Sequence, residues 1–153
     1  MGGLRRRTPL LALAGVVAAG GAVGATARAL LESAFPAQPG AWPWATFWIN
    51  VVGSFLLGAL LETLVRTGPD QGVRRAVRLG VGTGVLGGFT TYSTFVVEVE
   101  RLASGGHLGL GAAYAVVSVV LGIAAAAGGF AVATAVLRRR DARDPGTSPD
   151  AAT

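Results

Sequence analysis

Cysteine and lysine are absent from this chain of 153 residues, and histidine occurs once, as His107. Without cysteine the chain has no disulfide, no thiolate metal ligand and no thiol nucleophile. A single histidine also excludes a multi-histidine metal site. Charge is scarce, because 14% of the residues are charged whereas soluble domains average about 25%. Together with the lack of any visible nucleophile–base pair or phosphate loop, these absences argue against an enzyme and against a soluble globule.

Long apolar runs fill most of the chain instead. The sequence is 52% hydrophobic and contains 24 glycines, a residue that is more frequent in membrane helices than in soluble ones. A membrane-spanning helix needs about 20 mostly apolar residues. Stretches that meet this requirement predict spans at about residues 9–31, 46–65, 76–99 and 108–137. We therefore expect an all-α protein with four transmembrane helices.

These spans form one predicted membrane domain over residues 9–140. A short arm at residues 1–8 precedes it, and a polar tail at residues 141–153, which contains proline, is expected to be disordered. The arginines at positions 5–7 and the apolar run after them also resemble a secretory signal peptide, which would leave three spans. The first run continues into a glycine motif, Gly20-x-x-x-Gly24, which favours a retained span that packs closely on another helix.

The basic residues divide unequally between the two sides of a four-span protein. All of them are arginines, and only Arg28 and Arg101 fall on the side of the first and third loops. The other side holds Arg5, Arg6, Arg7, Arg66, Arg74, Arg75, Arg78, Arg138, Arg139, Arg140 and Arg143. Positive residues are retained on the cytoplasmic side of a membrane. We therefore predict that both termini are cytoplasmic, and the net charge of +5 needs no nucleic-acid partner.

The third predicted span is unusually polar. Gly87 and Gly88 stand at mid-span before hydroxyls at positions 90, 91, 93 and 94, which predicts a broken helix at mid-span and a polar path along the hydroxyls. Broken backbone at membrane depth is tolerated where it is buried or lines a cavity, and its free carbonyls can bind a cation. Aromatic rings at Phe89, Tyr92 and Phe95 recur every three residues and are expected on one side of this helix. Alternatively, the rings only pack and the hydroxyls bond their own helix.

Single polar residues mark the other spans. Arg28 ends the first span, where it either extends to the lipid headgroups or has a functional role. Asn50 lies within the second span and either joins helices together with Ser54 or serves a site. Tyr114 and Ser118 are four residues apart in the fourth span and so share a helix face.

Two acidic residues lie near span ends. Glu62 is close to the cytoplasmic end of the second span, where we expect it to contact water. Glu98 ends the third span, either in a vestibule beside the polar path or at the membrane interface.

Taken together, these segments resemble the CrcB/Fluc family of fluoride channels. The matching stretches are residues 20–28 in the first span, 48–55 in the second, 87–98 in the third and 113–122 in the fourth. The resemblance covers roughly residues 20–125 in the correct order and spacing. Two positions depart from the family pattern: Tyr92 stands where phenylalanine is usual, and Ala29 stands where an aromatic residue is common.

The resemblance implies a four-helix subunit of the bacterial inner (plasma) membrane that pairs antiparallel with a second subunit. It implies passive export of cytoplasmic fluoride, which relieves toxicity, and no enzyme activity. A structural Na⁺ buried at the dimer interface would be held by the backbone carbonyls of Gly87 and Thr90. The residues implied for the fluoride pathway are Asn50, Tyr92, Phe95, Ser93, Thr94, Tyr114, Ser118, Arg28 and Glu98.

The arginine bias bears on the partner. One gene supplies both orientations of an antiparallel homodimer only if its bias is near zero, so we hypothesise a homologous partner subunit of opposite orientation, with a homodimer as the open alternative. The alternative function is a proton-coupled small multidrug exporter, which also has four spans per subunit. That chemistry needs an acidic residue deep in a span, whereas Glu62 and Glu98 lie near span ends.

Overall fold

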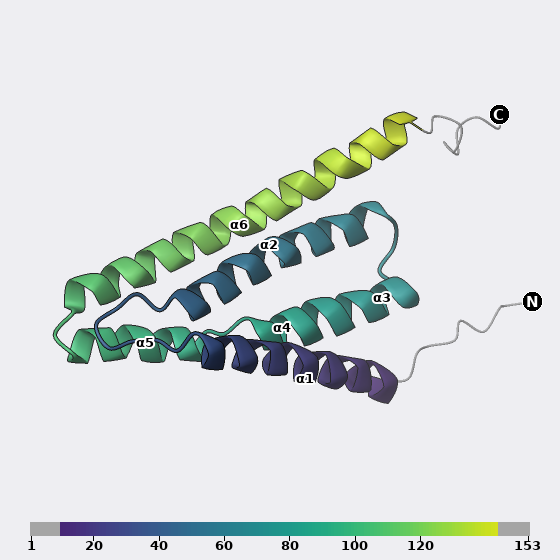
Figure 1. Ribbon diagram of the computed structural model, residues 1–153. Helices are drawn as coiled ribbons and strands as arrows, with labels where there is room; N and C mark the ends of the chain where they lie inside the picture. Colours follow the sequence, from purple (N-terminus) through teal and green to yellow (C-terminus); the bar gives the residue numbers. More distant parts are fainter. Residues whose placement is uncertain (1–9, 144–153) are drawn as a thin grey trace, which may run out of the picture.

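The computed structural model describes residues 10–143, and all regular structure in this range is helical. Three long helices are α1 (Leu10–Ala34), α2 (Trp44–Arg66) and α6 (Leu108–Arg143). Between α2 and α6 lies a row of shorter segments: α3 (Val73–Val77), the π-helix η1 (Arg78–Leu86), α4 (Gly87–Phe89) and α5 (Ser93–Ser104). Figure 1 shows an elongated bundle in which α6 lies along α2, and α1 lies along η1 and α4. The all-α prediction is confirmed for the described residues.

Three of these helices are long and apolar enough to cross a membrane, namely Leu10–Ala34, Trp44–Arg66 and Leu108–Arg140. The segment predicted as a fourth span at residues 76–99 is divided among α3, η1, α4 and α5. None of these pieces alone has the roughly 20 residues that a span requires. The third predicted span is therefore not one continuous α-helix.

The ends of the helices follow local sequence signals. α2 begins at Trp44, directly after Pro43, the last of three prolines in the first loop. Gly106 has φ +85° in the turn between α5 and α6, which falls in the interval between the third and fourth predicted spans. α6 extends to Arg143, and residues 141–143 are thus helical where a disordered tail was expected. The arm at residues 1–8 with its three arginines, the signal-peptide alternative and the tail beyond residue 143 lie outside the described residues.

Glycines bring α1 into backbone contact with η1 and α4. A Cβ on Gly24 would overlap the carbonyl oxygen of Val85, and a Cβ on Gly88 would lie 2.5 Å from the carbonyl oxygen of Gly21. Such distances are too short for real Cβ atoms, so these positions have room only for hydrogen. Without a hydrophobic driving force between helices in lipid, close backbone packing of this kind is a main source of helix association. The close approach predicted from Gly20 and Gly24 is confirmed.

α2 and α6 pack through small residues and one buried polar contact. A Cβ on Gly58 would overlap the carbonyl oxygen of Ala126, so these two backbones also touch. Glu62 of α2 is 5% exposed and accepts hydrogen bonds from Thr134 Oγ1 at 2.6 Å and from Arg66. The expectation that Glu62 contacts water is therefore wrong. Its carboxylate is buried between two helices because two donors replace the water it loses.

Much of the outer surface is apolar. In the three apolar helices, 6–17% of the residues in the most hydrophobic window are buried within the subunit. Exposed side chains such as Leu57, Val119 and Val120 would be unfavourable in water, but they suit lipid or another membrane subunit. A small internal core forms where Phe47, Leu102 and Tyr114 pack together.

Adding a methyl group at Gly24 should separate α1 from α4. We expect Gly24→Ala to destabilise the protein by about 1–3 kcal/mol, because the new Cβ would overlap backbone atoms that cannot move aside cheaply. Gly15→Ala is the matched control, since Gly15 lies on the same helix and a Cβ there would meet nothing within 4 Å. Thermal unfolding of the two variants in detergent, followed by circular dichroism, measures the difference. Equal melting temperatures would contradict this account of the α1 interface.

Candidate functional site

The polar residues of the chain converge on the break between α4 and α5. α4 ends at Phe89, the backbone of Thr90 after it is extended at φ −76° and ψ 154°, and α5 begins at Ser93. The broken helix predicted at mid-span is confirmed, although Gly87 and Gly88 themselves are helical and the break follows them. Gly88 serves instead as the point where the α1 backbone approaches, and the helix is interrupted a short way further along.

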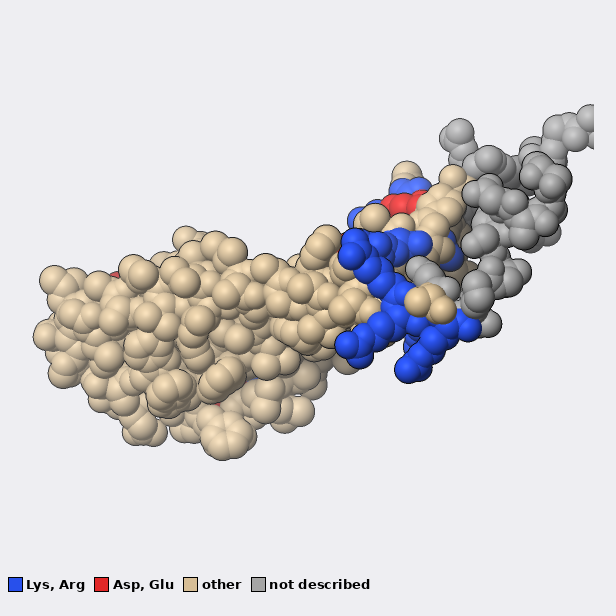
Figure 2. Space-filling model, turned by 90° about the horizontal axis from the view of Figure 1, so that it is seen from above, with Lys and Arg blue, Asp and Glu red and all other residues tan. Residues whose placement is uncertain are grey.

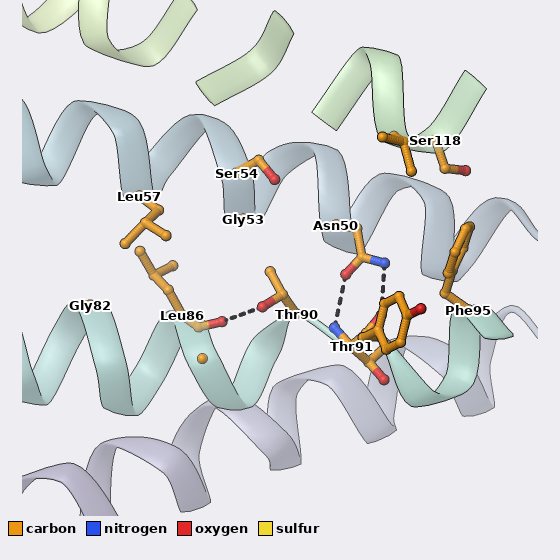
Figure 3. A pocket seen from close by; sticks show the side chains of 13 residues that line it. Asn50, Gly53, Ser54, Leu57, Gly82, Leu86, Thr90, Thr91, Phe95 and Ser118 are labelled. Carbon is orange, nitrogen blue, oxygen red and sulfur yellow. Dashed lines mark hydrogen bonds between the residues drawn. The ribbon is translucent and has the colours of Figure 1, made fainter. Parts of the chain in front are cut away.

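The side-chain amide of Asn50 holds the broken segment, residues 90–92 between α4 and α5, through two hydrogen bonds to one residue. Asn50 Nδ2 donates to the carbonyl oxygen of Thr91 at 2.9 Å, and the backbone N–H of Thr91 donates to Asn50 Oδ1 at 2.8 Å. Figure 3 shows both bonds crossing from α2 to the break. Asn50 therefore joins α2 to the broken segment, which is one of the two roles expected of it, and it does so through Thr91. Its amide supplies a donor and an acceptor to a residue that an interrupted helix leaves without them.

The break leaves two backbone carbonyls without their helical donors. In a continuous α-helix the N–H of Thr91 would donate to Gly87, and the N–H of Thr94 would donate to Thr90. Here the first is taken by Asn50, and the second donates to Thr91 Oγ1 at 3.1 Å. The Gly87 and Thr90 carbonyl oxygens thus keep lone pairs free for another ligand. Hard cations bind oxygen ligands of this type.

Arg28 reaches the break from the opposite side. Its Nε donates to the carbonyl oxygen of Gly88 at 3.2 Å, and its Nη1 lies 3.7 Å from Glu32 Oε1. Arg28 therefore binds α4 directly before the broken segment rather than only extending to the lipid headgroups. A guanidinium beside this segment places a positive charge next to backbone that has lost part of its own hydrogen bonding.

The hydroxyls of the third span divide into two kinds. Thr90 Oγ1 donates to the carbonyl oxygen of Leu86 at 2.9 Å, which is the back-bonding expected of a threonine that only satisfies its own helix. Thr91, Ser93 and Thr94 form a separate cluster, in which Thr91 Oγ1 lies 3.3 Å from Ser93 Oγ and 3.1 Å from Thr94 Oγ1. Three of the four hydroxyls are thus grouped where α5 begins.

An open groove of about 320 Å³ runs past this cluster on one side of the subunit. The groove is lined by Asn50 and Ser54 from α2 and by Ser118 from α6. It is also lined by Thr91 and Tyr92 from the broken segment and by Phe95 from α5, and Figure 3 shows most of these side chains. Gly87 and Thr90 also line it. The groove therefore brings together four of the predicted pathway or cation-site residues of the third span, Gly87, Thr90, Tyr92 and Phe95, with polar residues of two other helices.

The three aromatic residues do not share one side. Tyr92 is 79% exposed in this groove, with its ring centroid 6.0 Å from that of Phe95. Phe89 instead lines an apolar hollow with Leu31 and Trp48. The expected row of three rings is wrong because the break changes the direction of the chain between Phe89 and Tyr92, so helical spacing no longer relates the two.

Ser118 carries an unused hydrogen-bonding group. Its Oγ atom is buried, lines the groove, and has no hydrogen-bond partner among the residues that the structure describes. A buried hydroxyl without a partner costs free energy, so such a group calls for a ligand or ordered water. It faces the same groove as Asn50, whose amide has a second N–H beyond the one given to Thr91.

Behind Phe95 lies a buried polar cluster around Glu98. Glu98 is 7% exposed, and its two oxygens accept 2.7 Å hydrogen bonds from Thr46 Oγ1 and from the Tyr114 hydroxyl. Tyr114 is fully buried, and its ring centroid lies 5.3 Å from that of Phe95. Glu98 also lines a hollow with Arg101 and His107 at the end of α5, so it lies between the core and that hollow.

Several known proteins are similar to this chain. The family model for the CrcB-like proteins, described as camphor resistance (CrcB), matches residues 15–130. The fluoride-specific ion channel FluC 2 of Leifsonia xyli is 49% identical over 125 residues, covering 82% of this chain and 86% of its own length. FluC 1 of Cutibacterium acnes is 48% identical over 120 residues, with 78% and 82% covered. FluC 1 of Mycobacterium tuberculosis is 46% identical over 123 residues, with 80% and 88% covered.

This chain belongs to the CrcB family. With its three apolar helices, it is a multi-pass membrane protein. Within this CrcB protein, the structure places Asn50, Tyr92, Phe95 and Ser118 at one groove, and Tyr114 and Glu98 in the cluster behind it. Ser93 and Thr94 lie at the start of α5 but do not line the groove, and Arg28 lies on the far side of the break.

Sequence reasoning missed Thr46 as a member of the site. Thr46 is 1% exposed and donates to Glu98, although the two residues are 52 positions apart. The available signal was a hydroxyl in the first turn of an apolar span, where a buried donor needs an acceptor. Only the folded chain identifies Glu98 as that acceptor.

Replacing the Asn50 amide should loosen the break. We expect Asn50→Leu to lower the stability by about 1–3 kcal/mol, because the N–H and C=O of Thr91 would lose the groups that now satisfy them. Ser54→Ala is the matched control, since Ser54 is one helical turn away in the same groove. Thermal unfolding in detergent provides the measurement. A melting temperature for Asn50→Leu no lower than that of Ser54→Ala would show that Thr91 finds other partners.

Proposed function

We propose that this CrcB protein is a subunit of a fluoride-selective channel, which lets cytoplasmic fluoride leave passively and so relieves its toxicity. The observation that carries the proposal is the groove in which Asn50, the unpartnered Ser118 hydroxyl and the rings of Tyr92 and Phe95 lie together. Curated relatives at 46–49% identity carry the name fluoride-specific ion channel. Its role is transport rather than catalysis.

The chemistry of the groove suits a small anion. Fluoride is strongly hydrated, so a narrow pathway must replace its water with hydrogen-bond donors. The second N–H of Asn50 and the hydroxyl of Ser118 are such donors. The edges of the Tyr92 and Phe95 rings carry a partial positive charge and therefore attract an anion. A ring edge also has no hydrogen-bond acceptor that would repel the anion. Larger anions such as chloride would gain less from a few closely placed donors.

The pathway continues from the groove toward the buried cluster. Ser93 and Thr94 supply further hydroxyls at the start of α5, and Phe95 contacts both the groove and Tyr114. An anion that reaches Tyr114 would compete with Glu98 for the tyrosine proton donor. Arg28, bound to Gly88 beside the broken segment, would lower the cost of bringing a negative charge near it.

A structural Na⁺ fits the carbonyls of the break. Gly87 and Thr90 lack their helical donors, and both residues line the groove side of the subunit. Carbonyl oxygens are suitable ligands for a hard cation. We propose that this ion lies at an interface between two antiparallel subunits and supplies a fixed positive charge there. Within the subunit, the two hydrogen bonds between Asn50 and Thr91 hold the broken segment and its carbonyls in place.

The groove is open along the subunit, which suits closure by a second subunit of opposite orientation. We further propose four membrane crossings, with the segments from α3 to α5 as the third, and both termini in the cytoplasm of a bacterial cell. This orientation follows from the eleven arginines predicted on one side against two on the other. The bias favours a homologous partner with the opposite orientation. A multidrug exporter is not favoured, because the family relatives carry a channel name.

The function is tested with liposomes that contain the purified chain and are loaded with potassium fluoride. With valinomycin present to carry potassium, we expect fluoride efflux without a proton gradient or ATP, detected by a fluoride electrode. Chloride-loaded liposomes should show little efflux. If the chain alone is silent, co-reconstitution with an oppositely oriented family member is the second arm. Chloride passing as fast as fluoride would contradict the proposal, as would silence in both arms.

Ser118→Ala sharpens this test. We expect fluoride efflux to fall about tenfold or more, because the variant loses one hydrogen bond to an ion, while thermal stability stays unchanged since this hydroxyl has no described protein partner. Ser33→Ala is the control, because the Ser33 hydroxyl is exposed and donates to Leu30 of its own helix. Wild-type efflux from Ser118→Ala would remove Ser118 from the pathway.

The orientation has its own test. Separate C-terminal fusions to green fluorescent protein and to alkaline phosphatase, expressed in bacterial cells, should give fluorescence and no phosphatase activity. Replacing Arg74, Arg75, Arg138, Arg139 and Arg140 by glutamine should allow both signals, because the charge bias is then much smaller. Both signals from the unaltered chain would instead indicate dual orientation and favour a homodimer.

A further inference from the structure

A strongly basic surface forms one end of the bundle. Three of the eleven arginines predicted on one side, Arg5–Arg7, lie outside the described residues. The other eight occur at the end of α2, in α3, at the start of η1 and at the end of α6, and Figure 2 shows basic side chains gathered at this end. They are Arg66, Arg74, Arg75, Arg78, Arg138, Arg139, Arg140 and Arg143. Two of them are neutralised by buried or bidentate carboxylate contacts, Arg66 with Glu62 and Arg78 with Asp70.

A hollow of about 210 Å³ lies within this basic end, between α2 and η1. One wall is apolar and consists of Leu61, Leu64 and Val65 from the last turns of α2. The other wall consists of Gly68, Asp70, Arg74 and Arg78. An apolar wall directly beside guanidinium groups matches a molecule that has a hydrocarbon part next to an anionic part.

The carboxylate of Asp70 is committed to Arg78. Arg78 Nε lies 3.1 Å from both Asp70 oxygens, and its Nη2 donates to Oδ2 at 2.8 Å. The hydrogen bonds from Arg78 hold the pKa of Asp70 below its usual range, so this pair stays charged at neutral pH. Asp70 is therefore engaged with Arg78 and leaves the neighbouring arginine uncompensated.

Arg74 is that uncompensated arginine. No carboxylate among the described residues pairs with it, and it is half-buried in the wall of the hollow. Its guanidinium lies against Gly68, where a Cβ would overlap Nη1, and Gly68 has φ +133°, a conformation that favours glycine. Gly68 in the loop after α2 thus leaves space for the Arg74 guanidinium beside the apolar wall.

We propose that this hollow binds the headgroup of an anionic phospholipid, with Arg74 on the phosphate and an acyl chain along Leu61 and Val65. Both apolar residues are exposed, at the level where the last turn of α2 meets the arginines. A guanidinium binds phosphate through two parallel hydrogen bonds, and basic clusters beside membrane helices attract anionic lipids. The proposal depends on the membrane placement of the chain and not on the ion that it conducts.

The test is native mass spectrometry of the full chain in neutral detergent, titrated with phosphatidylglycerol or with phosphatidylcholine of the same acyl chains. We expect tighter binding of phosphatidylglycerol, and about fivefold weaker binding to Arg74→Gln, the loss expected for one arginine near a charged headgroup. Arg75→Gln is the matched control. It removes the same charge from the next residue, which is exposed and does not line the hollow.

Each outcome decides the proposal. Retention of phosphatidylglycerol by Arg75→Gln together with its loss from Arg74→Gln would support the hollow as the binding site. Equal losses in both variants would overturn it, because a diffuse charge effect would then explain the binding. Equal binding of the two lipids, or full competition by inorganic phosphate, would also overturn it. Arg74→Lys keeps the charge without the planar fork, and its intermediate affinity is expected even if Arg74→Gln folds poorly.

Discussion

The two hydrogen bonds between the Asn50 amide and Thr91 are the interaction on which the arrangement of the site depends. A helix that breaks within a membrane exposes backbone groups that lipid cannot satisfy. Asn50 forms hydrogen bonds with both the N–H and the C=O of Thr91, as a neighbouring β-strand would. Because Asn50 comes from α2, the break can exist only where α2 lies beside it. The same contact frees the carbonyl of Gly87 and positions the hydroxyls at the start of α5.

Close helix packing makes that contact possible. The glycines of α1, η1 and α4 allow backbones to touch, and Gly53 of α2 leaves room for Thr90, whose methyl group a Cβ there would overlap. Each of these positions lacks a side chain because another backbone or a site residue occupies the space. Small residues therefore have two roles in this bundle: they hold the helices together, and they bring the polar groups of three helices within hydrogen-bonding distance.

Two buried carboxylates of the bundle have partners, whereas three polar groups at the groove do not. Glu62 and Glu98 are buried, and each accepts hydrogen bonds from two side chains. The buried Ser118 hydroxyl has no partner among the described residues, and the Gly87 and Thr90 carbonyls have lost their helical donors. These unused groups all line the same groove. A hydroxyl donor and two carbonyl acceptors thus lie on one open side of the subunit.

From the sequence alone we could predict the helical class, three of the apolar spans and the glycine contact at Gly20 and Gly24. These properties depend on local composition and spacing, which a single chain displays directly. The folded chain was needed to place the break after Gly87 and Gly88, at Thr90, to separate Phe89 from Tyr92 and Phe95, and to show that Glu62 is buried. It also paired Thr46 with Glu98 and Asn50 with Thr91. Those outcomes depend on which distant residue satisfies each polar group, and helical periodicity carries no information about a partner on another helix.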